Sequence, residues 1–379
     1  MSCAARVDVA IVGAGISGLA TAAALRAADC SVAVLEARQR VGGRLLSLAG
    51  VDLGASWSWP PGEVRVEALA QRLGIESISQ RLDGEAFQTV GGRTQALGNV
   101  GSRMAPCGPG AVRFLGGYAT LPEALAETLP NGSLKLGCRV KAISQVEGGA
   151  QLAYDQFSEA GTQYVIARRV VIAVPPGISA ATISFEPPLP EPQRYKMAST
   201  ATWCGDWCKI IATFRTPFWR LKGASGVVST PGPIQIWWEG GGGDELKEQT
   251  NALVGLGVGK ACAALAHLQN VDGGANDTAE TIAELRALVL SALGPAYGSL
   301  IVDEQLIQTT LKTWIADDLT FAKAGTHREY GHRLLREPTP WGVFFAGTET
   351  EAQNGHVEGA IAAGERASSE VLASIASHV

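Results

Sequence analysis

The sequence predicts an α/β protein that contains a Rossmann-like dinucleotide-binding domain and is long enough for a second domain. Three observations predict this class. The 379 residues are enough for two domains, or for one large domain with a substantial subdomain. A strand, a glycine-rich turn, a helix and a second strand occupy residues 7–36. Near the C-terminus, an apolar strand again leads through a glycine-containing turn into a helical pattern, over residues 343–367.

The N-terminal elements follow the pattern of a nucleotide-binding unit. They are the strand Val7–Val12, the glycines Gly13, Gly15 and Gly18, a helix to about Ala28, the apolar run Ser31–Leu35, and Glu36. Gly13 permits a tight turn, Gly15 lets the backbone approach a pyrophosphate, and Gly18 lets the helix pack on the strand. The helix N-terminus offers N–H groups to phosphates, and Glu36 would accept hydrogen bonds from ribose hydroxyls. The pattern predicts a dinucleotide site; the alternative is a structural glycine-rich turn.

A second glycine pair follows directly. Ala37 and Arg38 lead into Val41-Gly42-Gly43-Arg44, where we expect another close backbone approach, with Arg44 as a charge-assisted partner of the same phosphates. The stretch Asp52–Trp57 comes next.

Together, "VAIVGAGISGLATAAAL", "VAVLEARQRVGGRLLS" and "VDLGASW" resemble the N-terminus of the flavin-containing amine oxidases. The resemblance implies FAD as the cofactor and contacts to it from Ser17, Glu36, Arg44 and the backbone of Ala55–Trp57. This segment alone does not separate amine oxidases from the related amino-acid oxidases, protoporphyrinogen oxidases and carotenoid desaturases.

The middle of the chain resembles the family less closely. Gly116–Tyr118, a helical pattern over Leu121–Leu129 and the strand-like Arg139–Ile143 are similar to the segment that returns to the FAD domain, which implies that Val140 packs near the adenine. A strand over Arg169–Val174, followed by Pro175-Pro176, and the run Phe185–Pro190 also fit the family pattern.

Lys209 is the most discriminating residue in this region. It opens the alternating stretch Lys209–Phe214, and a lysine that faces inward from a strand is costly unless it has a purpose. The resemblance of Thr202–Trp219 to the family implies that Lys209 holds a water beside the flavin. The alternative is a lysine at a strand end with its amine in solvent.

Three further features of the middle region carry weaker predictions. Cys204 and Cys208 lack a second ligand pair, so we expect buried thiols rather than metal or redox chemistry. Trp237 and Trp238 either line a substrate cavity or belong to an aromatic core. The short stretch Arg81–Phe114 stands where the family has a long helical insertion, which implies a reduced substrate domain and a more open flavin face.

The C-terminal segment resembles the family strongly. Val343–Thr350 and "GHVEGAIAAGERA" match its "FAGTET" and "GYMEGAxxAGERA" stretches. The helix N-terminus, through the N–H of Val357, would stabilise negative charge on reduced flavin. No cysteine follows Cys262, whereas the monoamine oxidases have a flavin-linked cysteine near the position of Lys323, so we expect non-covalent FAD. The residues expected to bind FAD are Gly13, Gly15, Ile16, Ser17, Gly18, Glu36, Ala37, Arg38, Gly43, Arg44, Gly54, Ala55, Ser56, Trp57, Val140, Trp314, Gly347, Glu349, Gly355 and Val357.

His356 departs from the family, which usually has a tyrosine there as one wall of an aromatic cage. The opposite wall falls near Ala324, with Phe321 as a substitute. Three interpretations of His356 remain: a flat wall of the cage, a proton acceptor beside the substrate, or a hydrogen-bonding group at the helix start.

Composition restricts the partners. The net charge of −5 argues against nucleic acid or an anionic membrane, and seven scattered cysteines fit reduced thiols in the cytoplasm. The apolar run at residues 9–25 is too short and too rich in glycine for a membrane span, and no basic segment or cleavage site makes it a signal peptide. We therefore expect no membrane anchor and no bound metal, and these features are compatible with a homodimer.

These observations lead to a domain division and to a ranked set of functions. The resemblance implies a Rossmann-like FAD-binding domain made of residues 1–80, 115–195 and 318–379. It also implies a substrate domain with a mixed sheet and helices, made of residues 81–114 and 196–317. The first function is oxidation of a small-molecule amine: a hydride passes to flavin N5, the imine is hydrolysed, and O₂ is reduced to H₂O₂. The alternatives are an L-amino-acid oxidase, a flavin-dependent oxidase or desaturase of a biosynthetic intermediate, and an FAD-bound interaction protein with little catalysis.

Overall fold

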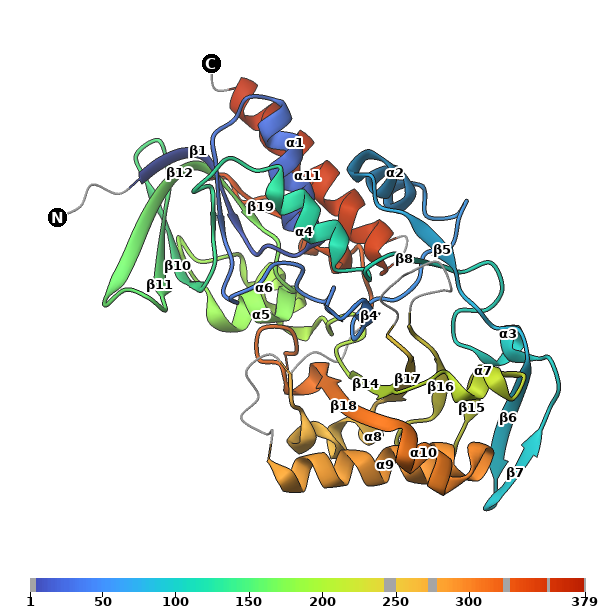
Figure 1. Ribbon diagram of the computed structural model, residues 1–379. Helices are drawn as coiled ribbons and strands as arrows, with labels where there is room; N and C mark the ends of the chain where they lie inside the picture. The colour runs from blue at the N-terminus through green and yellow to red at the C-terminus, as the bar shows by residue number, and fades with distance from the viewer. Residues whose placement is uncertain (1–4, 242–249, 272–277, 323–327, 353–354, 378–379) are drawn as a thin grey trace.

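The computed structural model describes residues 5–241, 250–271, 278–322, 328–352 and 355–377. Two large sheets organise this part of the chain, one at either end of the view in Figure 1. The first sheet has eight strands in the order β13-β10-β11-β12-β1-β2-β9, with β19 paired to β12. The second has seven strands in the order β18-β14-β17-β16-β15-β6-β7. The α/β class and the mixed second sheet predicted from the sequence are confirmed.

The strands of the first sheet come from both ends and the middle of the chain. They are β1 (Ala5–Val12), β2 (Val32–Leu35), β9 (Leu134–Lys135), β10 (Cys138–Val146), β11 (Gly149–Gln156), β12 (Thr162–Ile172), β13 (Ser184–Glu186) and β19 (Val343–Phe345). β1 pairs in parallel with β2 and β12, and β19 joins β12 in parallel, whereas β10, β11 and β12 form antiparallel pairs. The two glycine-rich segments, near opposite ends of the sequence, therefore follow β1 and β19, which both pair in parallel with β12 and end at the same edge of the sheet.

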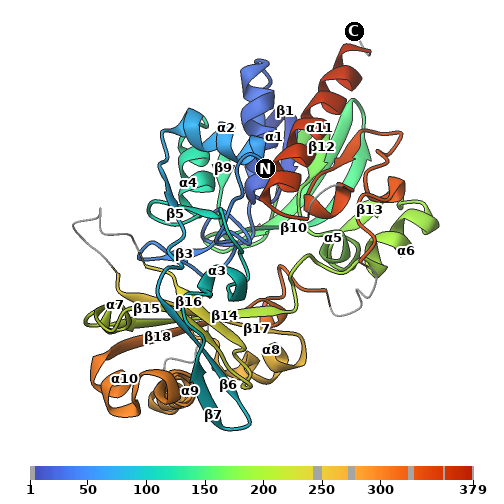
Figure 2. The ribbon, with the colours of Figure 1, turned by 90° about the vertical axis from the view of Figure 1, so that its right-hand side faces the viewer.

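Helices cover both faces of this sheet. They are α1 (Ile16–Ala27), α2 (Val64–Leu73), α4 (Thr120–Glu127) and α11 (Val357–Ala376) on one side, with α5 (Pro176–Thr182) and α6 (Glu191–Ser199) on the other. The alternation of a strand explains the two layers: Val9 and Ile11 of β1 pack among the first group, and Ala10 and Val12 face the second core. Figure 2 shows α1 and α11 side by side above the sheet.

The second sheet is mixed, because β15 and β6 are parallel and the other pairs antiparallel. Its strands are β6 (Glu85–Val90), β7 (Arg93–Ala96), β14 (Trp207–Phe214), β15 (Ala224–Ser229), β16 (Ile236–Glu239), β17 (Ala252–Val258) and β18 (Leu306–Thr313). The remaining elements are the strand pairs β3 (Ser47–Leu48) with β4 (Val51–Asp52) and β5 (Ser77–Ser79) with β8 (Val112–Phe114), the helices α3 (Gly101–Met104), α7 (Phe218–Leu221), α8 (Lys260–Ala264), α9 (Ala279–Tyr297) and α10 (Ser299–Gln305), and the 3-10 turns η1 (Ala266–Leu268), η2 (Trp314–Ala316), η3 (Arg333–Leu335) and η4 (Thr348–Thr350).

The two faces of the second sheet have different neighbours. On one face, Ile210 and Ala212 of β14 pack in a core with α9. On the opposite face, Ile211 packs with Val51 and Leu53, which follow the glycine pair and Arg44 in the sequence. Lys209 and Ile211 are two residues apart on β14, so their side chains lie on the same face of the sheet. This is the face directed toward the first sheet.

A side-chain cap marks the start of the long helix α9. Thr278 caps α9 by accepting a hydrogen bond from Thr281 N at 3.1 Å. Residues 260–268 form α8 followed by the 3-10 turn η1. Among the described residues, no helix combines the length and the apolar character that a bilayer crossing requires.

Candidate active site

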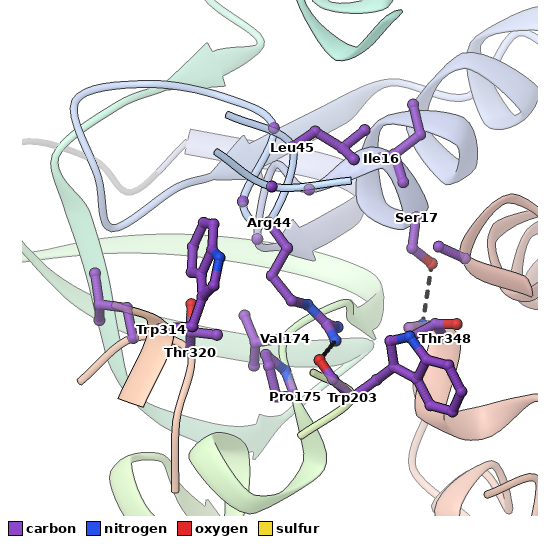
Figure 3. Close-up of a pocket in the computed structure, with 18 of the residues that line it drawn as sticks. Ile16, Ser17, Arg44, Leu45, Val174, Pro175, Trp203, Trp314, Thr320 and Thr348 are labelled. Atoms are coloured by element: carbon purple, nitrogen blue, oxygen red, sulfur yellow. Dashed lines mark hydrogen bonds between the residues drawn. The ribbon is translucent and has the colours of Figure 1, made fainter. Parts of the chain in front are cut away.

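A cavity of about 460 Å³ lies between the carboxyl ends of the strands of the first sheet and the second sheet, because its lining includes Val12, Leu35 and Ala173 as well as Trp207 and Lys209. Figure 3 shows residues that line it: Ile16 and Leu45 of the N-terminal unit lie at the top of the view, and the Arg44 side chain runs down to Trp203, with Trp314 and Thr320 to its left. Ligands of open α/β sheets bind in this position relative to the strands. The volume is within the range of small-molecule sites.

The glycine-rich turn leaves an open helix N-terminus at the cavity. Gly15 is the N-cap of α1, and neither a capping side chain nor an acidic residue occupies the first turn. A Cβ added at Gly15 would meet nothing within 4 Å, whereas one at Gly18 would fall 2.0 Å from Gly13 O. Gly15 thus borders open space in which a phosphate could meet the helix N–H groups, and Gly18 serves close packing. These features fit a dinucleotide.

Glu36 closes the next part of the cavity. Its carboxylate is 4% exposed and accepts hydrogen bonds from Ala14 N at 2.7 Å and from Arg38 N at 2.9 Å. Two oxygens with further lone pairs remain suited to ribose hydroxyls. The Arg38 guanidinium turns instead to Asp317 at 2.6 Å and to Thr320 Oγ1 at 2.8 Å. Burial by itself raises the pKa of Asp317, but Arg38 and Lys312 together hold it below its ordinary value.

Arg44 and Glu349 form a charged connection across the site. Glu349 is fully buried and accepts from both Arg44 terminal nitrogens, at 2.8 and 3.2 Å. It also accepts from Trp203 N at 3.0 Å, and Arg44 donates to Trp203 O at 3.0 Å (Figure 3). The expected phosphate ligand Arg44 and the expected cofactor contact Glu349 therefore hold each other and the backbone of Trp203.

Lys209 is buried, at 6% exposure, and its ammonium group lies in the cavity wall. Nζ donates to Gly54 O and to Ser56 Oγ, both at 2.6 Å, and lies 5.4 Å from the ring centres of both Trp57 and Trp238. Burial lowers the pKa of Lys209 to about 8, although Asp52 opposes this shift. The alternative of a strand-end lysine with its amine in solvent is wrong.

His356 is the N-cap of α11 and lines the same cavity. Its ring centre lies 5.3 Å from that of Trp59 and 5.7 Å from that of Trp203. Its Nδ1 is 2.9 Å from Oε1 of the buried Glu63. Phe321 is not among the residues that line the cavity, and Ala324 lies outside the described residues, as does Lys323. The aromatic neighbours of His356 thus come from two other segments.

Every expected cofactor-binding residue except Gly18 lines the cavity, together with Lys209 and His356. Sequence reasoning assigned no role to Trp59, Glu63, Trp203 or Thr320. The "WSWPP" stretch after Trp57 and the "TWCGDW" stretch before Lys209 carried the only available signal, a concentration of tryptophan beside family motifs.

The adjacent pair of tryptophans on β16, and two arginines of the second-sheet region, lie away from the cavity. Trp237 and Trp238 are core residues that do not line it. Arg220 pairs with Glu239 and donates to Asp83 O at 2.8 Å, and Arg215 reaches the Glu304 carbonyl, so neither arginine faces the cavity. The described part of the chain contains no His, Cys, Asp and Glu cluster that could hold a metal ion, and its six cysteines are free thiols.

The chain is similar to known proteins over its whole length. A sequence model described as flavin containing amine oxidoreductase matches residues 91–372, and one described as an NAD(P)-binding Rossmann-like domain matches residues 11–73. The chain belongs to the flavin-containing amine oxidoreductase family. Its cofactor is accordingly FAD, for which the open α1 N-terminus and buried Glu36 are suited.

Relatives of this flavin-containing amine oxidoreductase are themselves amine oxidases. Human amine oxidase [flavin-containing] B is 26% identical, with 96% of this chain and 86% of the human protein covered. Amine oxidase [flavin-containing] of Oncorhynchus mykiss is 25% identical, with coverage of 96% and 85%. A putrescine oxidase bound to putrescine has the same fold, with a TM-score of 0.76, 23% identity and coverage of 98% and 100%. Cyclohexylamine oxidase from Brevibacterium oxydans IH-35A also has a TM-score of 0.76, with 21% identity and coverage of 97% and 99%.

Proposed function

We propose that this chain oxidises a small-molecule amine with non-covalently held FAD, releases an imine that is hydrolysed to an aldehyde or ketone, and passes the electrons to O₂ as H₂O₂. Bound FAD supplies the two-electron acceptor for this chemistry. The observation that carries the choice of substrate is the aromatic group formed by Trp59, Trp203 and His356 in the cavity wall. Aromatic faces attract ammonium groups and pack well against apolar carbon chains.

The arginines favour an amine over an amino acid. A substrate carboxylate calls for an arginine beside the aromatic group. Arg215 and Arg220, which belong to the second-sheet region, point elsewhere, and Arg44 is committed to Glu349 and the Trp203 carbonyl. An amine without a carboxylate is therefore the better match to the described residues.

Lys209 is the proposed catalytic lysine. Its amine is desolvated, is held by Gly54 and Ser56, and has a pKa lowered to about 8 by burial, so it can exchange a proton near neutral pH. We assign it to proton movement during turnover. The Trp57 and Trp238 rings, whose centres are 4.8 Å apart, lie together on one side of the ammonium group and restrict its direction.

Two thiols border the cavity, and their state favours non-covalent FAD. Burial raises the pKa of Cys204 to about 12 and also raises the pKa of Cys138, so both remain thiols at neutral pH and are poor nucleophiles.

We further propose that the domains divide at the boundaries expected from the sequence, since each large sheet takes its strands from the corresponding segments.

Oxygen consumption and peroxide release test the proposal. Monoamines, diamines and secondary amines are supplied in parallel with the L-amino acids of matching side chain. We expect one or more amines to support both readouts with equal stoichiometry, and their amino-acid counterparts to support much less. Preference for the amino acid would replace this proposal with amino-acid oxidation, and no turnover with any donor would favour the interaction protein.

A further inference from the structure

Two helices meet at their N-termini beside the cavity. Glu63 is the N-cap residue of α2, and its side chain reaches His356, the N-cap residue of α11. In return Glu358, in the first turn of α11, accepts hydrogen bonds from Arg65 N at 2.9 Å and Val66 N at 3.0 Å. Each helix therefore supplies a carboxylate to the other, which fixes the His356 ring in the cavity wall.

The Glu63 carboxylate depends on His356 for its hydrogen bond and its ion pair. It is 4% exposed, and among the described residues its Oε2 atom has no hydrogen-bond partner. The ion pair with His356 is the only one recorded for Glu63 in that part of the chain. A buried carboxylate without a charged or hydrogen-bonding partner is costly, so Glu63 is compensated by a hydrogen bond from His356 Nδ1–H and would be compensated further by a second proton on the ring.

The remaining titratable groups around the pair do not supply this compensation. Burial raises the pKa of Tyr118, and the negative charge of Glu63 raises it further. Glu67 accepts from Ser58 Oγ at 3.2 Å, while Arg65 pairs with Glu358 and with Glu365. On the far side of Trp203, Glu349 pairs with Arg44, and burial raises the pKa of Tyr330 to about 12.

We propose that Glu63 is a positioning residue that makes His356 the proton acceptor for the ammonium group of the substrate. Nδ1 carries the proton that faces Glu63, and Nε2 is the nitrogen that meets the substrate. The ammonium N–H bond breaks, an Nε2–H bond forms, and the electron pair stays on the substrate nitrogen. Glu63 neutralises the resulting imidazolium, and Trp59 and Trp203 hold its plane. This role rests on the proposed amine-oxidase function, because it prepares the neutral amine that is oxidised.

The test compares wild-type holoenzyme with Glu63→Gln, His356→Gln and the control Glu67→Gln, which makes the same change one turn along α2. The rate of anaerobic flavin reduction by an amine is measured against pH. We expect the acid limb of this profile to move to lower pH in Glu63→Gln, because the carboxylate no longer stabilises the imidazolium. His356→Gln should lose that limb and at least ten-fold in rate, and Glu67→Gln should match wild type. Identical acid limbs in wild type and Glu63→Gln would overturn the proposal.

A second readout needs no turnover. Proton NMR of the ¹⁵N-histidine-labelled holoenzyme should contain a downfield Nδ1-bound proton that disappears in His356→Gln and moves upfield in Glu63→Gln. Its absence in wild type would overturn the pair even if amines are oxidised. If the signal is present and no amine reduces the flavin, the pair stands, but the proposed function fails and the role of Glu63 in it fails as well.

Discussion

Ser17 Oγ accepts a hydrogen bond from the backbone N–H of Gly347 at 3.0 Å, across 330 positions of sequence. Both residues are in the cavity wall, one in the first turn of α1 and the other two residues after the end of β19. The same helix meets α11 closely, because a Cβ at Gly364 would fall 2.6 Å from Ser17 O. The two glycine-rich segments are thus joined into one site by direct contact.

Ser17→Ala should weaken this junction. The buried Gly347 N–H would lose its partner, which we expect to lower the free energy of unfolding of the apoprotein by about 1 kcal/mol and to weaken FAD binding severalfold. Urea denaturation and FAD titration measure the two effects. Ser369→Ala, which removes a hydroxyl on the exposed side of α11, is the control. Unchanged FAD affinity in Ser17→Ala would contradict the role of this contact.

The glycines of the first motif should separate cofactor binding from folding. Gly15→Ala meets no neighbour within 4 Å, so the apoprotein should lose no more than about 1 kcal/mol, the scale of an N-cap change. The new methyl group would occupy the space in which we expect the FAD pyrophosphate to bind. We therefore expect FAD affinity to fall at least ten-fold. Gly18→Ala places its Cβ 2.0 Å from Gly13 O and should destabilise the apoprotein itself. Equal FAD affinity in Gly15→Ala and wild type would contradict the proposed phosphate position.

The sequence predicted the cofactor half of the site well because its signals are local. A turn that needs Gly13 at φ 101° and a helix that begins at Gly15 are encoded by neighbouring residues, and Glu36 follows at the end of the next strand. Lys209 was also predictable, since strand alternation fixes the face of its side chain.

The substrate half was not predictable to the same degree, because it depends on tertiary contacts. Trp203 reaches His356 through a loop held by Glu349 and Arg44, and Glu63 reaches it through the packing of α2 against α11. Neither contact leaves a periodic or spaced pattern in the sequence. The expected partner wall near Ala324 came from counting along one segment, whereas the aromatic neighbours of His356 come from other segments.

Lys209→Met should change stability in a pH-dependent way. The pKa of Lys209 is lowered by burial from about 10.5 to about 8, so between these values the unfolded chain binds more protons than the folded one. The cost of the buried charge is therefore fully present below pH 8 and is lost as pH rises toward 10.5. We expect the stability of wild type relative to Lys209→Met to increase by about 3 kcal/mol over this range.

Denaturation of both apoproteins at several pH values measures this difference. Lys135→Met, a substitution of a partly buried lysine in the first sheet, is the control. A difference between wild type and Lys209→Met that does not vary between pH 8 and 10 would contradict a desolvated amine.

Acid precipitation should release all of the FAD. Cys138 and Cys204 are the cysteines that line the cavity, and burial keeps both as thiols. We expect the flavin absorbance entirely in the supernatant, as in a Cys204→Ser variant. Flavin that stays with the wild-type pellet and leaves the Cys204→Ser pellet would identify a covalent bond to Cys204.

The central claim is that one cavity holds FAD and presents it to an amine. Its most direct test is the visible absorbance spectrum of the purified, FAD-supplemented protein, followed by anaerobic addition of amines and amino acids. The account predicts an oxidised-flavin spectrum that bleaches with at least one amine and returns when O₂ is admitted. A protein that acquires no flavin spectrum, or whose bound flavin no amine bleaches, would contradict it.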